Sequence, residues 1–248
     1  MIPKIIHYCW FGGNPIPKNL KNYIDGWKEK LSGYEIIEWN ENNFDIASSV
    51  QYVKEAYEAK KYAFVSDYVR LYALKEYGGV YLDTDVEIVK PFDGLLDNAS
   101  LVTGFEAKDS LITAFIACEK DEKHIAEFVE SYKNRNFKIA ENRYDMTPIN
   151  TKFTELMSKY GLILNNMRQS LKDSVEIYPY DVFCGYDIEN SHAKITANTC
   201  TIHHFECSWK KSSFKIWFKY RVCVKILQKI LGIERYDKLK AKLKTVNK

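Results

Sequence analysis

The sequence lacks several features that would assign it to a common class. Its six cysteines form no CxxC pair and have no regular spacing, which argues against the disulfide framework of small secreted domains. The start, MIPKIIHYCWFGG, does not have the basic-then-apolar pattern of a signal peptide, and no apolar run approaches the length that spans a bilayer. No GxGxxG follows the first apolar segment, so the dinucleotide-binding fingerprint is absent. These absences predict a reduced, cytosolic protein.

Positive and negative residues are both common, but they are unevenly distributed along the chain. The 248 residues carry a net charge of +3, and 46% of them are hydrophobic, which is ample for a sizeable core. From residue 209 onward there are thirteen Lys or Arg and two acids, a net charge of +11, which leaves −8 for residues 1–208. We therefore expect two regions with different roles, a catalytic domain over 1–209 and a basic amphipathic helical tail over 210–248.

The most informative stretch runs from Tyr62 to Glu87, YAFVSDYVRLYALKEYGGVYLDTDVE. Its first part is apolar almost all round, which is typical of a buried helix. Asp67 and Arg70 interrupt this surface three residues apart, so they are neighbours on one face. A charge in such a setting is costly unless it is paired or holds a ligand. The pair is therefore either an internal salt bridge, part of a binding site, or both.

The second part of this stretch carries two carboxylates. After Gly78 and Gly79, the alternation over Val80–Val89 predicts a strand with Asp83 and Asp85 on one face, about 6–7 Å apart. Two carboxylates this close repel each other unless a cation lies beside them, and oxygen ligands favour Mg²⁺, Ca²⁺ or Mn²⁺. An EF-hand is excluded, because Ile88 and Gly94 occupy the positions that require Gly and Glu.

Strand and helix patterns alternate along much of the chain, which favours an α/β fold with a parallel-rich sheet. Predicted strands cover 4–10, 35–39, 101–105, 111–117, 174–178 and 200–204, and predicted helices cover 17–31, 50–60 and 121–133. Trp10 would stand at the carboxyl end of the first strand, where α/β sheets bind ligands. His7, inside that strand, is expected to be a satisfied core histidine.

The order S-D-x-x-R, then G-G-x-Y-x-D-x-D, resembles glycosyltransferase family 32, whose members contain a DxD motif. A lone DxD is common by chance, so the compound pattern carries the resemblance, together with IPKIIHYCWFGG and a late Ser-Trp. The resemblance implies a GT-A type nucleotide-diphosphosugar transferase fold with a mostly parallel central sheet. It also implies a metal-dependent enzyme that takes a sugar from a UDP-sugar donor with retention of configuration.

The resemblance also implies roles for individual residues. Trp10 would stack on the uracil, and Ser66 and Tyr81 would line the nucleotide pocket. Asp67 and Arg70 would bind sugar hydroxyls, with Arg70 also near the phosphates. Asp83 would hold ribose and sugar hydroxyls, and Asp85 would bind the metal. Near residues 146–150 the family usually carries a T-G-P turn, which lacks its glycine here, and Asn150 would reach the donor.

A third metal ligand is expected in TCTIHHFECSW, residues 199–209. The resemblance suggests His204 as a nitrogen ligand and Ser208 as an oxygen ligand, with Trp209 covering the donor. A nitrogen ligand favours Mn²⁺ over Mg²⁺. His203 and Glu206 are rivals of His204, and because adjacent strand residues face opposite ways, only one of the two histidines can reach the ion. The alternative is a histidine packed in the sheet.

The basic tail mixes aromatic and aliphatic residues with Lys and Arg, which is typical of helices that lie on an anionic membrane surface. The alternative is a packed helix with a solvated basic face, and no nucleic-acid-binding motif is present. We therefore expect a cytoplasmic enzyme that is peripheral on the inner face of the plasma membrane.

The function expected from these features is transfer of a hexose or N-acetylhexosamine from a UDP-sugar. The acceptor would be a growing surface polysaccharide, such as a capsule, or a lipid-linked oligosaccharide. No candidate nucleophile for double displacement stands out, so the acceptor is expected to attack from the side of the leaving group. Two alternatives remain open: a catalytically silent sugar-nucleotide or glycan-binding module, and a metal-dependent sugar-nucleotide hydrolase.

Overall fold

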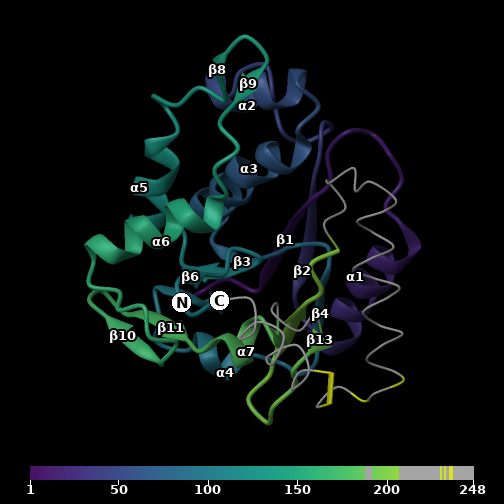
Figure 1. The fold of residues 1–248 in the computed structure, drawn as a ribbon, viewed down its shortest axis with the longest axis vertical. Helices are drawn as coiled ribbons and strands as arrows, with labels where there is room; N and C mark the ends of the chain where they lie inside the picture. The colour runs from purple at the N-terminus through teal and green to yellow at the C-terminus, as the bar shows by residue number, and fades with distance from the viewer. Residues whose placement is uncertain (188–191, 207–229, 231, 233–234, 237–248) are drawn as a thin grey trace. The chain divides into compact units, whose positions relative to one another are not determined.

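The computed structural model describes residues 1–187 and 192–206, together with residues 230, 232, 235 and 236 (Figure 1). The chain divides into two units, one of residues 1–186 and 193–206 and the other of residues 187–192 and 207–248. The predictions for Ser208 and Trp209 lie outside the described residues, and so does the basic tail apart from those four positions.

An eight-stranded sheet forms the centre of this unit. Its order is β10 (Gln169–Leu171), β11 (Val175–Tyr178), β5 (Leu101–Ala107), β7 (Phe115–Cys118), β3 (Gly79–Leu82), β1 (Ile5–Cys9) and β2 (Glu35–Trp39), with β6 (Ser110–Leu111) paired to β5. The strands β1, β2, β3, β5 and β11 run in one direction, whereas β7 is antiparallel between β3 and β5. The predicted α/β fold with a mostly parallel central sheet is therefore confirmed.

Helices take part in two hydrophobic clusters on the two faces of the sheet. One cluster includes residues of α2 (Gln51–Glu58), α3 (Tyr62–Tyr77), α5 (Lys123–Ser131) and α6 (Ile149–Lys159), and the other those of α1 (Lys18–Lys30), α4 (Asp93–Leu96) and α7 (Tyr180–Phe183) (Figure 1). In β3, Tyr81 belongs to the first cluster, while Val80 and Leu82 belong to the second. Alternate side chains of a strand point to opposite faces, so β3 is buried on both.

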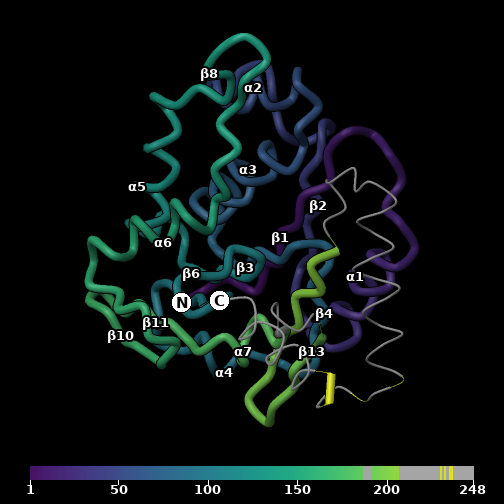
Figure 2. Tube along the Cα trace, in the orientation of Figure 1, coloured from purple at the N-terminus to yellow at the C-terminus, as the bar shows by residue number. Residues whose placement is uncertain are grey.

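The described residues also form three two-stranded sheets. They are β4 (Val86–Ile88) with β14 (Thr201–His203), β8 (Lys138–Ala140) with β9 (Arg143–Tyr144), and β12 (Tyr186–Asp187) with β13 (His192–Ala193). The pairing of β4 with β14 is antiparallel, and Figure 2 shows the late segment running beside β4. Among the residues described, no helix is both long and apolar enough to span a bilayer.

The prediction of one continuous strand over Val80–Val89 is wrong. The chain turns after Leu82, where the Asp83 N–H donates to the Ala114 carbonyl and the Val86 N–H donates to that of Asp83. The segment therefore leaves the central sheet as a turn and continues as β4 in a different sheet. The predicted strand over 111–117 is likewise divided, into β6 and β7.

The buried helix of the central motif is confirmed, and so is its end. Helix α3 stops at Gly78, whose φ of 66° lies in the left-handed region that favours glycine. A Cβ at this position would lie 2.6 Å from the backbone nitrogen of Lys120, so a larger residue would also clash. Because the helix ends sharply, β3 starts at the next residue and leads directly into the segment that holds Asp83 and Asp85.

Candidate functional site

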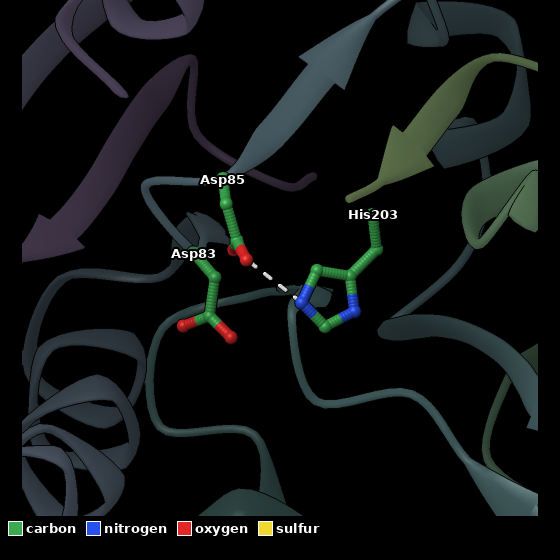
Figure 3. Close-up of side chains that lie close together, drawn as sticks. All are labelled: Asp83, Asp85 and His203. Carbon is green, nitrogen blue, oxygen red and sulfur yellow. Dashed lines mark ion pairs between the residues drawn. The ribbon is translucent and has the colours of Figure 1, made fainter. Parts of the chain in front are cut away.

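The turn between β3 and β4 presents two carboxylates to a histidine of β14. One potential ligand atom from each of Asp83, Asp85 and His203 lies within 4.8 Å of the others (Figure 3). His203 Nε2 is 3.4 Å from Asp85 Oδ1. Three side chains from two segments more than a hundred residues apart thus converge, and the antiparallel pairing of β14 with β4 brings them together.

Backbone hydrogen bonds hold Asp85 in place. Its Oδ2 accepts from the Glu206 N–H at 2.8 Å, and its carbonyl accepts from the His204 N–H at 3.0 Å. Burial alone would raise the pKa of Asp85, but His203 and the Glu206 N–H outweigh it and lower the pKa. Burial alone would lower the pKa of His203, whereas Asp85 raises it. The two groups therefore stabilise each other in their charged forms.

Arg70 connects the helix to the turn. Its guanidinium donates to Asp67 Oδ1 at 2.9 Å and to the Thr113 carbonyl at 2.8 Å, and it lies 3.3 Å from Asp83 Oδ1. It is buried, and its Nε also donates to the Ser66 carbonyl. Most of the five N–H donors of an arginine are therefore bonded to protein groups. Arg70 is bound by the site and orients Asp67 and Asp83, rather than projecting freely toward a ligand.

Tyr81 and Asp67 lie beneath the turn. Tyr81 is almost completely buried, its hydroxyl donates to Asp83 Oδ1 at 2.9 Å, and Arg70 lies 4.6 Å above its ring. Tyr81 was expected to line the nucleotide pocket; in the structure its side chain is buried and its hydroxyl supports Asp83. Burial raises the pKa of Asp67 to about 6, and Arg70 opposes the rise. The salt-bridge hypothesis for Asp67 and Arg70 is thus confirmed, and the pair adjoins Asp83.

The structure places His203, not His204, beside the aspartates. His204 Nε2 lies 2.8 Å from Glu87 Oε2, and its ring stacks on Tyr23 of α1 at 4.7 Å between centroids. The two histidines thus have different neighbours, and the geometry favours His203, not the expected His204, as the candidate ligand. The reason is the register of β14 on β4, in which His203 pairs with Val86 immediately after the Asp83–Asp85 turn.

Trp10 and Ser66 occupy the edges of this region. Trp10 follows β1 directly and is half-buried, with its Nε1 donating to the Asn14 carbonyl. Since β1 and β3 are parallel neighbours, Trp10 and Asp83 both follow the carboxyl ends of adjacent strands. Ser66 donates its hydroxyl to the Tyr62 carbonyl at 3.1 Å.

Glu106 is a site neighbour that the sequence prediction missed. It lies in β5, its Oε1 is 3.8 Å from His203 Nδ1, and its Oε2 accepts from Asn150 Nδ2 at 2.7 Å. Burial raises the pKa of Glu106, and His203 and Asn150 oppose that rise. A usable signal was present, because an acid near the carboxyl end of the apolar run LVTGF stands where α/β sheets bind ligands. Asn150 contacts the site indirectly, through Glu106.

This set of groups fits a divalent cation. Asp83, Asp85 and Glu106 bring three carboxyl groups together, and Arg70 and His203 are the basic groups that face them. Carboxylate oxygens with one imidazole nitrogen are suitable ligands for Mn²⁺ or Mg²⁺, and Asp83, Asp85 and His203 would hold the ion. The side chain of Asp83 is 28% exposed, compared with 13% for Asp85, so the cluster is open to solvent from the Asp83 side.

Comparison with curated proteins gives relatives of moderate identity. The chain is 28% identical over 180 residues to "Subversion of eukaryotic traffic protein A" of Legionella pneumophila, covering 59% of this chain and 27% of the relative. It is 29% identical over 112 residues to "Inositol phosphoceramide mannosyltransferase 1" of Schizosaccharomyces pombe, covering 41% of this chain and 33% of the relative. The chain thus spans less than half the length of each of these proteins.

Two further comparisons concern structure and family. Among solved structures the chain is similar to the PaToxG glycosyltransferase, with a TM-score of 0.48 and 19% identity, over 64% of this chain and 68% of that chain. Residues 17–102 match the family described as "Glycosyltransferase sugar-binding region containing DXD motif", and this segment includes Asp67, Arg70, Asp83 and Asp85. The resemblance inferred from the motifs is thereby confirmed for residues 17–102, which match the sugar-binding region of the DXD-containing glycosyltransferases.

Proposed function

We propose that this protein is a metal-dependent glycosyltransferase that moves a hexose or N-acetylhexosamine from a UDP-sugar to a glycan acceptor, with retention of configuration. The observation that carries the proposal is the convergence of Asp83, Asp85 and His203 on a turn inside the matched sugar-binding region. A divalent cation held by these three residues would neutralise the charge that develops on a departing diphosphate.

Within this proposal the chain's own residues bind and orient the donor. Asp83 and Asp67 are held in fixed positions by Arg70, so their remaining oxygen lone pairs can accept from sugar or ribose hydroxyls. Trp10, at the end of β1, offers a half-buried aromatic face for a base. The expected mechanism is attack by the acceptor on the face from which the nucleotide leaves, as the resemblance to the family implies.

The acceptor is proposed to approach through a hollow beside α6. The hollow has a volume of about 510 Å³ and is lined by polar groups that include Ser110, Asn150, Thr151 and Glu155. Asn150 also bonds Glu106, which links the hollow to His203. Thr151 is exposed, so Thr151→Trp should fill the hollow and raise the KM for acceptor. An unchanged acceptor KM would place the acceptor elsewhere.

The proposal includes a lipid-linked oligosaccharide or growing surface polysaccharide as acceptor at the cytoplasmic face of the plasma membrane. Its support is the charge of +11 that the sequence carries after residue 208. Binding of the full chain to vesicles with and without phosphatidylserine tests the membrane part. Binding that requires the anionic lipid and weakens with salt would support it. Equal binding to neutral vesicles, or none, would contradict it.

The activity is tested by nucleotide release from a panel of UDP-sugars, with and without Mn²⁺. GDP-mannose is tested beside the UDP-sugars, because one relative is named a mannosyltransferase. Asp85→Ala should lower turnover by about 10³-fold, the scale of losing one main electrostatic contributor at an active site. Glu87→Ala is the matched control, since Glu87 is a nearby carboxylate that faces His204 instead.

The two alternative functions are separated by the same assay. Metal-dependent release of nucleotide that is independent of any acceptor would indicate a hydrolase. Metal-dependent binding of a sugar nucleotide without turnover would indicate a binding module. Absence of both binding and turnover over the whole panel would overturn the donor-site assignment.

A further inference from the structure

The nitrogen of His203 that faces away from Asp85 has no hydrogen-bond partner among the described residues. This atom, Nδ1, is buried and unsatisfied. A buried polar atom without a partner is costly and therefore points to a nearby group that could satisfy it. The ring itself is confined, because Phe205 packs against it with 3.9 Å between ring centroids.

The acceptor that faces this nitrogen is Glu106. Its Oε1 lies 3.8 Å from His203 Nδ1, while its Oε2 is held by Asn150 Nδ2 at 2.7 Å. The side chains of Glu106 and His203 are only 15% and 11% exposed. Because Asn150 holds one carboxylate oxygen, the other is directed at the histidine, and a shift of about 1 Å would bring the pair into hydrogen-bond range.

We propose that Glu106 is a positioning residue for His203. The Glu106 carboxylate accepts a hydrogen bond from Nδ1–H of His203. The lone pair of Nε2 is then directed toward Asp83 and Asp85. Histidines that bind metal ions commonly donate their second N–H to a carboxylate, which fixes the tautomer and the orientation of the ring. The inference rests on the proposed function, since the cation at Asp83, Asp85 and His203 is part of it.

A second Glu–His pair next to β14 provides an internal control. Glu87 lies 2.8 Å from His204, whose ring stacks on Tyr23 of α1. Both pairs combine one glutamate with one histidine, and the two histidines are adjacent in sequence. Only Glu106 adjoins the histidine that faces the aspartates, so only its removal should affect the cation.

The first test measures Mn²⁺ affinity by calorimetry and by electron paramagnetic resonance. Glu106→Ala should weaken binding by about 10–100-fold, the usual effect of removing a partner of a metal-bound histidine. It should also weaken the nitrogen coupling in the Mn²⁺ spectrum. Glu87→Ala should leave both unchanged. Glu106→Leu, which fills similar space without an acceptor, serves if the alanine variant does not fold. Wild-type affinity in a folded Glu106 variant would overturn the proposal.

The second test needs no metal and separates this inference from the proposed function. Nitrogen NMR of the histidine rings, at a pH where His203 is neutral, reports which ring nitrogen carries the proton. We expect the Nδ1–H tautomer in the wild type and loss of that preference in Glu106→Ala, with the His203 signal assigned from His203→Gln. An Nε2–H tautomer in the wild type would overturn the role of Glu106. A wild type that shows the Nδ1–H tautomer but binds no Mn²⁺ would count against the proposed metal site only.

Discussion

His7 and His203 are both buried histidines, yet their surroundings are opposite in character. His7 lies in β1, where its Nε2 is 2.8 Å from the Gly78 carbonyl and its Nδ1 accepts from Trp39 Nε1 at 3.1 Å. Both of its nitrogens are satisfied by neutral groups, as predicted for a core histidine. Burial lowers its pKa to about 4, and the Gly78 hydrogen bond only partly offsets this effect.

His203 faces carboxylates instead of neutral groups. Burial would lower its pKa too, but Asp85 reverses the direction, and one ring nitrogen has no partner in the part of the chain that the structure describes. Burial therefore does not distinguish a structural histidine from a functional one. The distinction lies in the neighbours: a complete set of neutral partners stabilises the fold, whereas unneutralised carboxylates and an unsatisfied nitrogen indicate a ligand.

Removal of Arg70 should have the largest effect on stability, because the carboxylates of the site depend on a buried cation, whereas His7 has only neutral partners. Arg70→Met leaves Asp67 and Asp83 without their buried partner. Loss of one member of a buried pair costs about 3–5 kcal/mol of unfolding free energy. Urea unfolding at pH 7 measures it, and Asp67→Asn in the same chain should restore part of the loss. Lys21→Met removes the exposed Lys21–Asp25 pair as a control and should cost under about 1 kcal/mol. Equal losses would contradict the buried role.

The contribution of His7 to stability should depend on pH. Its folded pKa of about 4 lies below the unfolded value of 6.5, so the unfolded chain binds the extra proton. Stability is therefore complete above pH 6.5 and falls by on the order of 3 kcal/mol as the pH decreases toward 4. Unfolding free energies of the wild type and His7→Gln, compared across this range, test it. A wild-type slope equal to that of the variant would show that His7 is protonated in the folded state.

These two regions also show what the sequence could predict. The strand and helix around His7 were predictable because local apolar patterns define them, and Glu35–Trp39 and Tyr62–Tyr77 have the predicted extents. The turn at Asp83 was not predictable, because the alternating pattern continues through it. There the Val86 N–H donates to the Asp83 carbonyl, and the Asp83 N–H donates to the carbonyl of Ala114, in a distant segment.

The choice between His203 and His204 failed for a related reason. Alternation along a strand shows that the two side chains diverge, but it does not show which of them faces the site. That depends on the register of β14 against β4, a pairing of segments more than a hundred residues apart. The motif residues Asp67, Arg70, Asp83 and Asp85 do lie in one region, linked through Arg70 and the turn, whereas Glu106 belongs to no motif and was found through its contacts.

Substitution of the two adjacent histidines tests the corrected assignment. His203→Ala should weaken Mn²⁺ binding by about 100-fold, because it removes the only nitrogen ligand that the described residues place beside Asp85. His204→Ala should change the affinity by less than about threefold, since His204 pairs with Glu87. Calorimetry on both variants measures the difference. The reverse order of effects would restore His204 as the ligand.

Trp10→Ala should produce the smallest of these effects and separates the nucleotide base from the cation. Stacking of a base on an aromatic side chain contributes about 1–3 kcal/mol, so the KM for the UDP-sugar should rise by about tenfold. Trp10 lies at the end of β1 and contacts Asn14 rather than the aspartates, so Mn²⁺ affinity without nucleotide should be unchanged. Trp10→Phe retains a stacking face and should recover most of the loss. If Trp10→Ala instead weakened Mn²⁺ binding and left the KM unaltered, the end of β1 would support the metal cluster, and the base would have to lie on another surface.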